Sequence, residues 1–524
     1  MKSNKRKLIQ KISSEWGQQN YDPRNFDLIE SYAAHNTLVP FHRLSPQTTT
    51  DIDLYELFCF IDRTNSKPGQ QFLFDKLTSP SGTVSELEAF NRQVAFFSVH
   101  KKEREEAQFL LKQLNKNDAY YISTLLKEKL LEKPTWAKIF IADSLLVILL
   151  LILSPKYPIL LIWLIIPFAI NLFFHYWNKR NTYMFVKSFP QLDLLLKTSK
   201  SLLKKNLPFE KIKVQKSLDS LKAFQRKFRL LNFGQTDNNE MAQLIFWVTD
   251  LFKALFLIEI HSFFSVLKTL QHKKQDIDNV IRYTGSIDAA ISTASLRSAI
   301  DNYCTPVFTA HQKELHAKNL YHPLIKNCVP NSIDIKNQSI LITGSNMSGK
   351  STFIRAVAIN SILAQTIYTC FADEFVTPVV KLFSSIRIDD SLLDGKSYYF
   401  EEVSIMGNLI KESTGTFQGL FILDEVFKGT NTIERVAAAK AILSYLNKNE
   451  NIVLVSTHDI ELAGLLNTEY DLHHFVENIE NDKLVFDHKL KPGPLKSRNA
   501  IKLLELSGYP SEITNEAKFI ANKN

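Results

Sequence analysis

The chain has 524 residues, of which 45% are hydrophobic and 22% are charged, and its formal net charge is +9. This composition excludes a largely disordered chain, and the length allows about three domains. The four cysteines (Cys59, Cys304, Cys328 and Cys370) are far apart and form no CxxC pair, which excludes a disulfide framework and a zinc ribbon. We therefore expect folded domains in a reducing compartment.

The first two thirds of the chain has the composition of a helical scaffold. Met1–Lys11 is basic, and no apolar run of seven or more residues follows it, so no signal peptide is predicted. Ten of the fifteen glycines lie at or after Gly344, and glycine serves where a backbone takes positive φ or approaches a ligand closely. We predict a tail over 1–45, a helical domain from residue 46, and the chemistry in the last third.

The stretch from Ile139 to Trp177 predicts a transmembrane helical hairpin. It contains only two charged residues, and each half supplies about the 20 apolar residues that a spanning helix needs. Pro155 and Pro158 bracket the turn, because neither helix can continue through them. Lysine and arginine flank both outer ends, which favours cytoplasmic termini. We expect a hairpin over 136–178 in a lipid bilayer; the alternative is a buried hairpin within a soluble fold.

Positive charge is concentrated after the expected hairpin. The segment 197–229 contains eleven basic and two acidic residues. Its apolar residues are spaced as in helices with one hydrophobic face. Three interpretations stay open for this basic segment: contact with anionic lipid headgroups, a nucleic-acid channel, or a solvated helix face.

A phosphate-binding loop is the strongest local motif. The run 339–343 reads as a short β-strand, 344–351 matches GxxxxGK[ST], and 352–365 is helix-prone. Successive backbone N–H groups of such a loop surround phosphates, and the helix N-terminus adds partial positive charge. We expect Lys350 to reach the β- and γ-phosphates and Ser351 to bind Mg²⁺. The expected ATP-binding residues of the loop are Gly344, Ser345, Asn346, Met347, Ser348, Gly349, Lys350, Ser351 and Thr352.

Two later apolar strands end in residues suited to nucleotide hydrolysis. The first ends in Asp424 and Glu425. Asp424 suits Mg²⁺ binding, and Glu425 suits activation of the attacking water as a general base. The second strand, 451–456, is followed by Thr457 and His458, and His458 is a candidate sensor of the γ-phosphate. The order of these motifs predicts an ATPase with Lys350, Glu425 and His458 as catalytic residues.

These motifs resemble those of the MutS family of mismatch-repair ATPases, which are ABC-type ATPases. The resemblance is carried by GSNMSGKST at 344–352, LDEVFKGTNT at 423–432 and STHD at 456–459, and it extends upstream into lever-like helices. It implies a mixed fold: an all-α lever or core domain, interrupted by the transmembrane hairpin, and then an α/β P-loop ABC-type ATPase domain. The expected boundaries are 46–135, 136–178, 179–318 and 319–524.

The same resemblance implies further site residues and partners. Residues 395–402 (GKSYYFEE) resemble the family's signature segment, which crosses to the partner subunit. Ser397 would therefore contact nucleotide in trans within a homodimer. The family's base-packing positions would fall on Val329 and His488. ATP and Mg²⁺ are the implied cofactors.

The chain also departs from the family pattern. Only about 45 residues precede the lever-like helices, so the family's mismatch-reading and connector domains are expected to be absent. Phe427 and Lys428 replace the usual Gly-Arg pair, and Ser345 and Ser348 replace Pro and Gly in the loop. ATP hydrolysis is expected to survive these changes.

Two functions stay open from the sequence. The first is a membrane-anchored, homodimeric MutS-like ATPase that couples ATP to binding of duplex, mismatched or branched DNA. The alternative is an ATP-switched membrane scaffold that acts on an unknown protein partner without DNA. Both place a multi-pass protein in the inner (cytoplasmic) membrane with both termini and the ATPase domain on the cytoplasmic side. A transporter subunit is disfavoured, because two spans per chain give only four in a dimer.

Overall fold

The computed structural model describes residues 2–128, 130–131, 138–172, 183–231, 258–311, 313–345, 347–387, 398–427, 431–480, 483–495, 504–505 and 508–521. The chain forms two compact units. Unit 1 comprises Met1–Val39, Asp62–Asp75 and Arg92–Leu296, and unit 2 comprises Pro40–Ile61, Lys76–Asn91 and Arg297–Asn524. The domain boundaries expected from the sequence stay a prediction.

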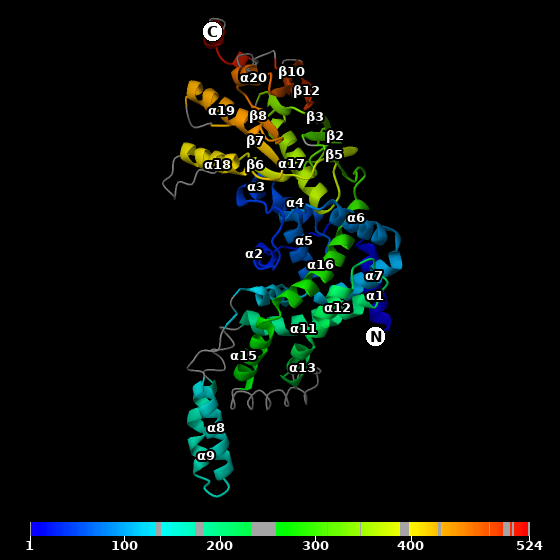
Figure 1. The fold of residues 1–524 in the computed structure, drawn as a ribbon, viewed down its shortest axis with the longest axis vertical. Coiled ribbons are helices and arrows are strands. Elements are labelled where there is room, and N and C mark those ends of the chain that lie inside the picture. The colour runs from blue at the N-terminus through cyan, green and yellow to red at the C-terminus, as the bar shows by residue number, and fades with distance from the viewer. Residues whose placement is uncertain are drawn as a thin grey trace. The chain divides into compact units, whose positions relative to one another are not determined.

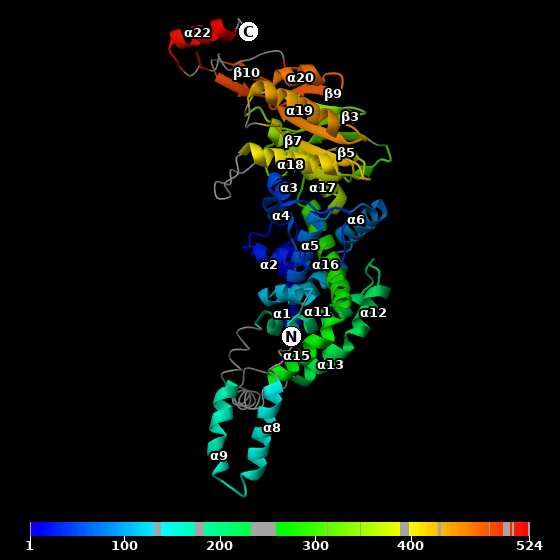
Figure 2. The same ribbon diagram turned by 60° about the vertical axis from the view of Figure 1, so that its left-hand side comes forward.

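The regular elements of unit 1 in the described part of the chain are all helices. Its longest helix, α16, follows α15 after a break of two residues (Figures 1 and 2). Phe189 of α11 and Phe263 of α15 bring their ring centroids within 5.8 Å, and Ser199 of α11 lies 2.7 Å from Thr284 of α16, oxygen to oxygen. The helices of this unit are α1 (Lys2–Ser14), α2 (Phe26–Glu30), α7 (Lys101–Leu111), η1 (Lys112–Leu114), η2 (Asn117–Leu126), α8 (Lys138–Leu153), α9 (Leu160–Trp163), α11 (Tyr183–Leu203), α12 (Ile212–Ser220), α13 (Lys222–Leu231), α15 (Ile258–Gln271) and α16 (Lys274–Arg297), and α5 (Lys67–Thr78) and α6 (Val84–Val99) continue into unit 2.

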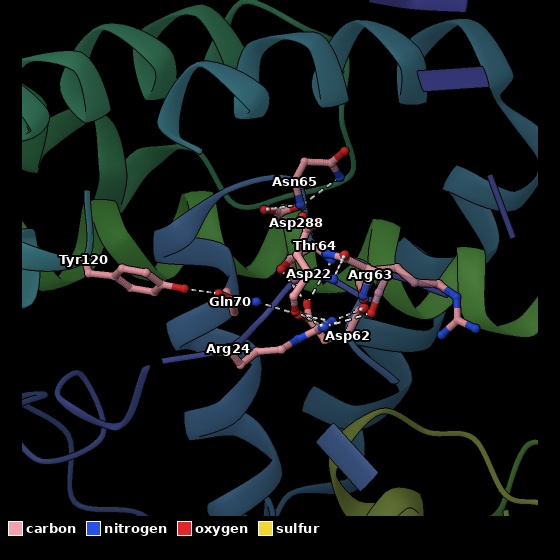
Figure 3. Close-up of polar contacts among 11 residues, drawn as sticks. Asp22, Arg24, Asp62, Arg63, Thr64, Asn65, Gln70, Tyr120 and Asp288 are labelled. Carbon is pink, nitrogen blue, oxygen red and sulfur yellow. Dashed lines mark hydrogen bonds and ion pairs between the residues drawn. The ribbon is translucent and has the colours of Figure 1, made fainter. Parts of the chain in front are cut away.

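A buried polar network joins α16 to the start of α5. Asp288 is fully buried, and its carboxylate accepts hydrogen bonds from the backbone N–H groups of Asn65 (2.9 Å) and Ser66 (2.8 Å) and from their side chains (Figure 3). Beside it, Asp62 is also fully buried and pairs with Arg24 at 3.2 Å. Buried carboxylates are tolerated when paired or hydrogen-bonded in this way. The network therefore fixes how α5 begins against α16.

Unit 2 is an α/β structure built on a six-stranded sheet of order β12-β9-β4-β8-β7-β6. All neighbouring strands are parallel except β12, which pairs antiparallel with β9. A second sheet has the order β1-β5-β2-β3, and β10 and β11 form a hairpin. The strands are β1 (Val307–Phe308), β2 (Glu314–Leu320), β3 (Asn331–Lys336), β4 (Ser339–Thr343), β5 (Glu374–Thr377), β6 (Lys381–Ser385), β7 (Gly419–Asp424), β8 (Ile452–Thr457), β9 (Tyr470–His474), β10 (Glu477–Glu480), β11 (Lys483–Phe486) and β12 (Lys491–Pro492).

Helices cover the six-stranded sheet because its central strands are apolar on both faces. Parallel strands buried on both faces read as continuous hydrophobic runs, and β4 and β8 are buried at every residue. Phe421 and Leu423 of β7 pack with α18, α19 and α20, whereas α17 contacts β7 and β8 outside that cluster (Figure 1). The helices of this unit are α3 (Pro46–Asp51), α4 (Leu54–Ile61), α17 (Lys350–Thr366), α18 (Tyr398–Glu412), α19 (Thr432–Leu446), α20 (Ile460–Leu466) and α22 (Ser511–Ala521).

The expectation of a transmembrane hairpin over 136–178 is wrong. No helix in the described part of the chain is long and apolar enough to cross a membrane. Helix α8 has 16 residues, which span about 24 Å at 1.5 Å per residue, short of the roughly 30 Å hydrocarbon core. The second apolar run is interrupted, because α9 ends at Trp163 and Pro167 has no N–H to donate to the Trp163 carbonyl. The parts of 136–178 at 136–137 and 173–178 lie outside the described residues.

This correction extends to every expectation that depended on the hairpin. The sequence-based assignment to the inner membrane, with cytoplasmic termini and a cytoplasmic ATPase domain, is overturned with it. The lipid bilayer is likewise withdrawn as a partner. The error arose because counting apolar residues over a window does not register where the helix ends.

The basic segment lies on the end of α11 and on α12 and α13. Val214 and Leu218 of α12 and Phe224 and Phe228 of α13 are buried, so the apolar side of each helix faces the unit. The outer side carries basic residues, and these include the exposed side chains of Lys200, Lys204, Lys213, Lys216, Lys222, Arg226 and Lys227. The segment is therefore an amphipathic helical surface whose charge points outward.

Candidate nucleotide-binding site

The loop between β4 and α17 requires glycine at both ends. Gly344 has φ +153° and Gly349 has φ +112°, and such positive values are strained for residues with a Cβ atom. A Cβ at Gly344 would lie 2.8 Å from the carbonyl oxygen of Phe475. Gly349 is also the N-cap of α17, so the backbone N–H groups of the first helical turn are available to an anion.

Lys350, the first residue of α17, folds its side chain back into the loop. The side chain is buried, and Nζ donates to the carbonyl oxygens of Gly344 (2.7 Å) and Ser345 (2.8 Å). The Ser348 hydroxyl also donates to the Ser345 carbonyl, at 2.8 Å. These contacts hold the ammonium group at the concave side of the loop, where a phosphate would meet it.

A cavity of about 430 Å³ brings together most of the site residues expected from the sequence. Its walls come from the loop and first turn of α17, from the segment between β2 and β3, from the residue after β7 and from the residues after β11. The expected residues among its lining are Val329, Ser345, Met347, Gly349, Lys350, Ser351, Thr352, Glu425 and His488. The phosphate loop, a carboxylate and the two expected base-packing positions therefore share one hollow.

Asn331 joins the two walls that carry Val329 and His488. Its side-chain amide donates to the carbonyl oxygens of Val329 (3.2 Å) and His488 (3.0 Å), and its side-chain oxygen accepts from the N–H of Leu490 (2.8 Å). The His488 Nδ1 atom lies 3.0 Å from the Ser348 carbonyl oxygen. No role for Asn331 was predicted from the sequence, although its place two residues after Val329 was a usable signal.

Further lining residues were also missed by the sequence analysis. Tyr321, His322, Ile325 and Cys328 face the cavity from the segment after β2. Burial lowers the pKa of His322 to about 4, so this imidazole is neutral near pH 7 and contributes no positive charge to the hollow.

The carboxylate side of the site is built by two adjacent parallel strands. Asp424, the last residue of β7, pairs in register with Ser456 of β8, and the Ser456 hydroxyl donates to the Asp424 carboxylate. Glu425 follows with φ +55°, and its N–H donates to the Ser456 carbonyl at 2.8 Å. His458 Nδ1 lies 3.0 Å from Glu425 Oε1. The two strand ends thus place Asp424, Glu425 and His458 in one group.

A second ion pair lies behind His458. Arg435 of α19 forms a two-pronged pair with Asp459, with Nε–Oδ2 and Nη2–Oδ1 distances of 3.1 and 2.9 Å. Asp459 Oδ1 is in turn 3.8 Å from His458 Nε2. Both nitrogens of the imidazole therefore lie beside carboxylates, Glu425 on one side and Asp459 on the other.

Some expected residues do not line the cavity. Gly344, Ser348, Asp424 and His458 are not among its lining residues, but each contacts a lining residue or precedes one directly in the chain. Asn346 and Ser397 lie outside the described residues. The assignment of Ser397 to a partner's nucleotide therefore stays a prediction.

The residues at the carboxylate side fit a magnesium ion held together with phosphates. A hydroxyl at Ser351 and a carboxylate at Asp424 are oxygen donors, which this hard cation prefers. Within the described residues no group of three or more His, Cys, Asp or Glu is placed to hold a metal. Mg²⁺ usually takes only one or two protein ligands and completes its shell with phosphate oxygens and water, so the donor set is adequate.

The C-terminal part of the chain matches a known protein family. Residues 340–523 match the family model described as MutS domain V. The C-terminal part of the chain is therefore similar to domain V of the MutS family. The resemblance drawn from the motifs is thereby confirmed, and the matched region contains the MutS-type phosphate loop, Asp424, Glu425 and His458.

Several curated MutS proteins are similar to this chain over part of their length. The DNA mismatch repair protein MutS of Lactobacillus gasseri is 32% identical over 255 residues, which are 46% of this chain and 29% of that protein. The protein of the same name from Thermus thermophilus is 32% identical over 201 residues, 38% of this chain and 24% of the relative. The DNA mismatch repair protein MutS of Clostridium kluyveri is 30% identical over 285 residues, which are 51% of this chain and 32% of that protein. The matches thus cover about a third or less of each of these MutS relatives.

Proposed function

We propose that this protein binds and hydrolyses ATP in the cavity of unit 2. The observation that carries the proposal is that one hollow is lined by the phosphate loop, Glu425, Val329 and His488. A hollow of about 430 Å³ is in the size range of nucleotide-sized ligand sites. The apolar Val329 side chain and the His488 ring would pack the base, and the loop N–H groups would hold the phosphates.

The site has a residue to bind the phosphates and a residue to accept the proton of the attacking water. Lys350 would exchange its contacts with the Gly344 and Ser345 carbonyls for the β- and γ-phosphate oxygens. Glu425 would accept the proton of the attacking water, and His458 would hold that carboxylate through the 3.0 Å contact. When bound at Ser351 and Asp424, Mg²⁺ supplies charge neutralisation to the transferring phosphoryl group.

A single substitution in the phosphate loop tests the ATPase. Lys350→Ala removes the one basic residue of the 344–351 motif and should abolish phosphate release and weaken ATP binding. Lys336→Ala is a matched control, because Lys336 pairs with Asp334 on the exposed face of β3 in the same unit. Phosphate release by the unmodified protein that equals the Lys350→Ala background would contradict the proposal.

We further propose that the protein acts as a homodimer on DNA. The relatives that it matches are named DNA mismatch repair proteins, and Ser397 would reach the partner's nucleotide in the dimer. The basic segment supplies a surface for phosphates. Within the described residues, the exposed Lys213 and Lys216 of α12 have no ion-pair partner, whereas Lys222 pairs with Asp219 at 2.8 Å.

Fluorescence anisotropy with duplex, mismatched and branched DNA across a salt titration tests this second proposal. A double Lys213→Gln and Lys216→Gln variant should bind more weakly, and the slope of log affinity against log salt should become shallower by about 0.9 for each phosphate that is no longer neutralised. Lys222→Gln, whose cation is already paired, is the control. Affinity that does not depend on salt, or an unchanged slope, would contradict DNA binding through this surface.

A further inference from the structure

A segment near the N-terminus is built into the nucleotide-binding unit. Helices α3 and α4 belong to unit 2 although some 300 residues separate them from the six-stranded sheet in sequence. Helix α3 packs on β6, the edge strand. Asp51 at its end is fully buried and accepts from the Ser384 hydroxyl (2.7 Å) and from the N–H groups of Ile386 (3.1 Å) and Arg387 (2.8 Å). The segment is therefore anchored at the end of β6.

Asp53, two residues later, is placed between two arginines. It has φ +51°, and its carboxylate forms a two-pronged pair with Arg387, with an Nη2–Oδ2 distance of 3.2 Å. The same Oδ2 atom is 3.6 Å from Nη1 of Arg355. Arg355 lies on α17, five residues after Lys350, so Asp53 connects the phosphate-loop helix to the end of β6.

The Arg355 guanidinium is incompletely satisfied. Its side chain is only 17% exposed, and its buried Nε has no hydrogen-bond partner among the described residues. Burial and the neighbouring Arg387 lower the pKa of Arg355, while the carboxylates of Asp53, Asp51 and Asp424 oppose that shift. Arg355 thus retains an unused donor within electrostatic reach of Asp424, the expected magnesium ligand.

Arg355 has one carboxylate in contact, Asp53, and a second, Asp424, within electrostatic reach. Its 3.6 Å ion pair is with Asp53, and Asp424 ends β7, the strand that α17 contacts. If Asp53 lost its charge, the repulsion between the two arginines would persist. Asp51 already accepts hydrogen bonds from Ser384, Ile386 and Arg387, so Asp424 would become the carboxylate left for Arg355. A guanidinium paired with Asp424 would oppose a divalent cation at the same carboxylate.

We propose that Asp53 is a positioning residue for the magnesium site. Asp53 holds the Arg355 guanidinium in an ion pair and so keeps this guanidinium from neutralising Asp424. The inference rests on the proposed ATPase function. A segment far upstream of the phosphate loop would thus help to keep Asp424 available to bind Mg²⁺.

The test separates metal dependence from folding. Asp53→Asn keeps the shape of the side chain and removes its charge. The Mg²⁺ concentration for half-maximal turnover should rise about tenfold, the order that one close charge produces, and excess Mg²⁺ should restore turnover. Affinity for a fluorescent ATP analogue in EDTA should stay within about twofold, whereas the gain in affinity on adding Mg²⁺ should shrink. Asp334→Asn, which breaks an exposed pair with Lys336, should change none of these values.

A second variant makes the test specific to Arg355. In the double variant Asp53→Asn with Arg355→Gln, the competing cation is gone, so the Mg²⁺ requirement should return towards that of the unmodified protein. A double variant that needs as much Mg²⁺ as Asp53→Asn would overturn the inference, as would unchanged Mg²⁺ dependence in the single variant. If Asp53→Asn does not fold, Asp53→Gly with the same titrations replaces it, because glycine also removes the charge and suits the φ of +51°. If the unmodified protein does not turn over ATP, both this inference and the proposed ATPase function are overturned. If the unmodified protein turns over ATP and Asp53→Asn has the same Mg²⁺ dependence, this inference alone is overturned.

Discussion

His458 lies against Glu425, with 3.0 Å between His458 Nδ1 and Glu425 Oε1. The contact links the ends of two adjacent parallel strands, β8 and β7. Glu425 takes a left-handed backbone conformation, φ +55°, which costs energy in a residue with a Cβ atom and recurs where a site requires it. The imidazole therefore meets a carboxylate that the backbone has turned out of the strand direction.

Glu425→Gln should separate ATP binding from ATP turnover. Glutamine preserves the size of the side chain but cannot accept the proton of the attacking water, so turnover should fall by about 10²–10⁴-fold. ATP affinity should stay close to that of the unmodified protein. Phosphate release and nucleotide titration measure the two quantities, and near-normal turnover would refute the general-base assignment.

Arg435→Ala should lower turnover without weakening ATP binding. The change frees Asp459 from its two-pronged pair, and Asp459 can then move towards His458 Nε2, now 3.8 Å away. A displaced imidazole would misplace Glu425, and we expect roughly tenfold slower turnover at an unchanged KM. Lys440→Ala is the control on the same helix, since it breaks the comparable pair with Glu469 (3.1 Å). Equal effects of the two variants would assign Arg435 a purely structural role.

The local parts of the site could be predicted from the sequence, because short motifs specify them. Gly344 and Gly349 indicated a loop with positive φ between a strand and a helix, and the structure has φ +153° and +112° there. Asp424 and His458 follow apolar runs that form the adjacent strands β7 and β8. Backbone periodicity and glycine placement are local properties, so one sequence suffices to read them.

The long-range contacts could not be predicted in the same way. Nothing in the sequence around Asp53 shows that it meets Arg355 and Arg387 some 300 residues later, because any surface carboxylate has the same local pattern. The failed hairpin has a different cause. Apolar content over 136–178 was sufficient for two spans, but the lengths of α8 and α9 depend on where the hydrogen-bond ladder stops.

Gly69→Ala should destabilise unit 1 through Asp288. A Cβ at Gly69 would lie 2.1 Å from Asp288 Oδ2, in the network that Figure 3 shows, and such overpacking typically costs about 1–3 kcal/mol. Gly407→Ala is the matched control within α18, because no atom lies within 4 Å of its added Cβ; it should stabilise by about 1 kcal/mol through helix propensity. Chemical denaturation measures both changes, and equal effects would show that the network tolerates the methyl group.

The stability of unit 1 should fall as pH rises from about 4 to 6 because of Asp288. Complete burial raises the pKa of this carboxyl from 3.8 to about 6, despite the hydrogen bonds from Ser66 and Asn65 that favour the charged form. Between these two values the folded protein binds the proton that the unfolded chain has released, so each rise in pH favours unfolding. A shift of about two pKa units corresponds to about 3 kcal/mol, fully lost above pH 6.

Asp288→Asn isolates this effect, since asparagine does not titrate. The free energy of unfolding of the unmodified protein, minus that of the variant, should decrease by about 3 kcal/mol between pH 4 and pH 7 and be flat above. The variant itself should be less stable at low pH, because its amide group meets the hydroxyl and N–H donors of Ser66 and Asn65 with one acceptor fewer. Denaturant titrations at pH 4, 5, 6 and 7 measure the difference, and a difference that does not change with pH would show that Asp288 keeps an ordinary pKa in the folded protein.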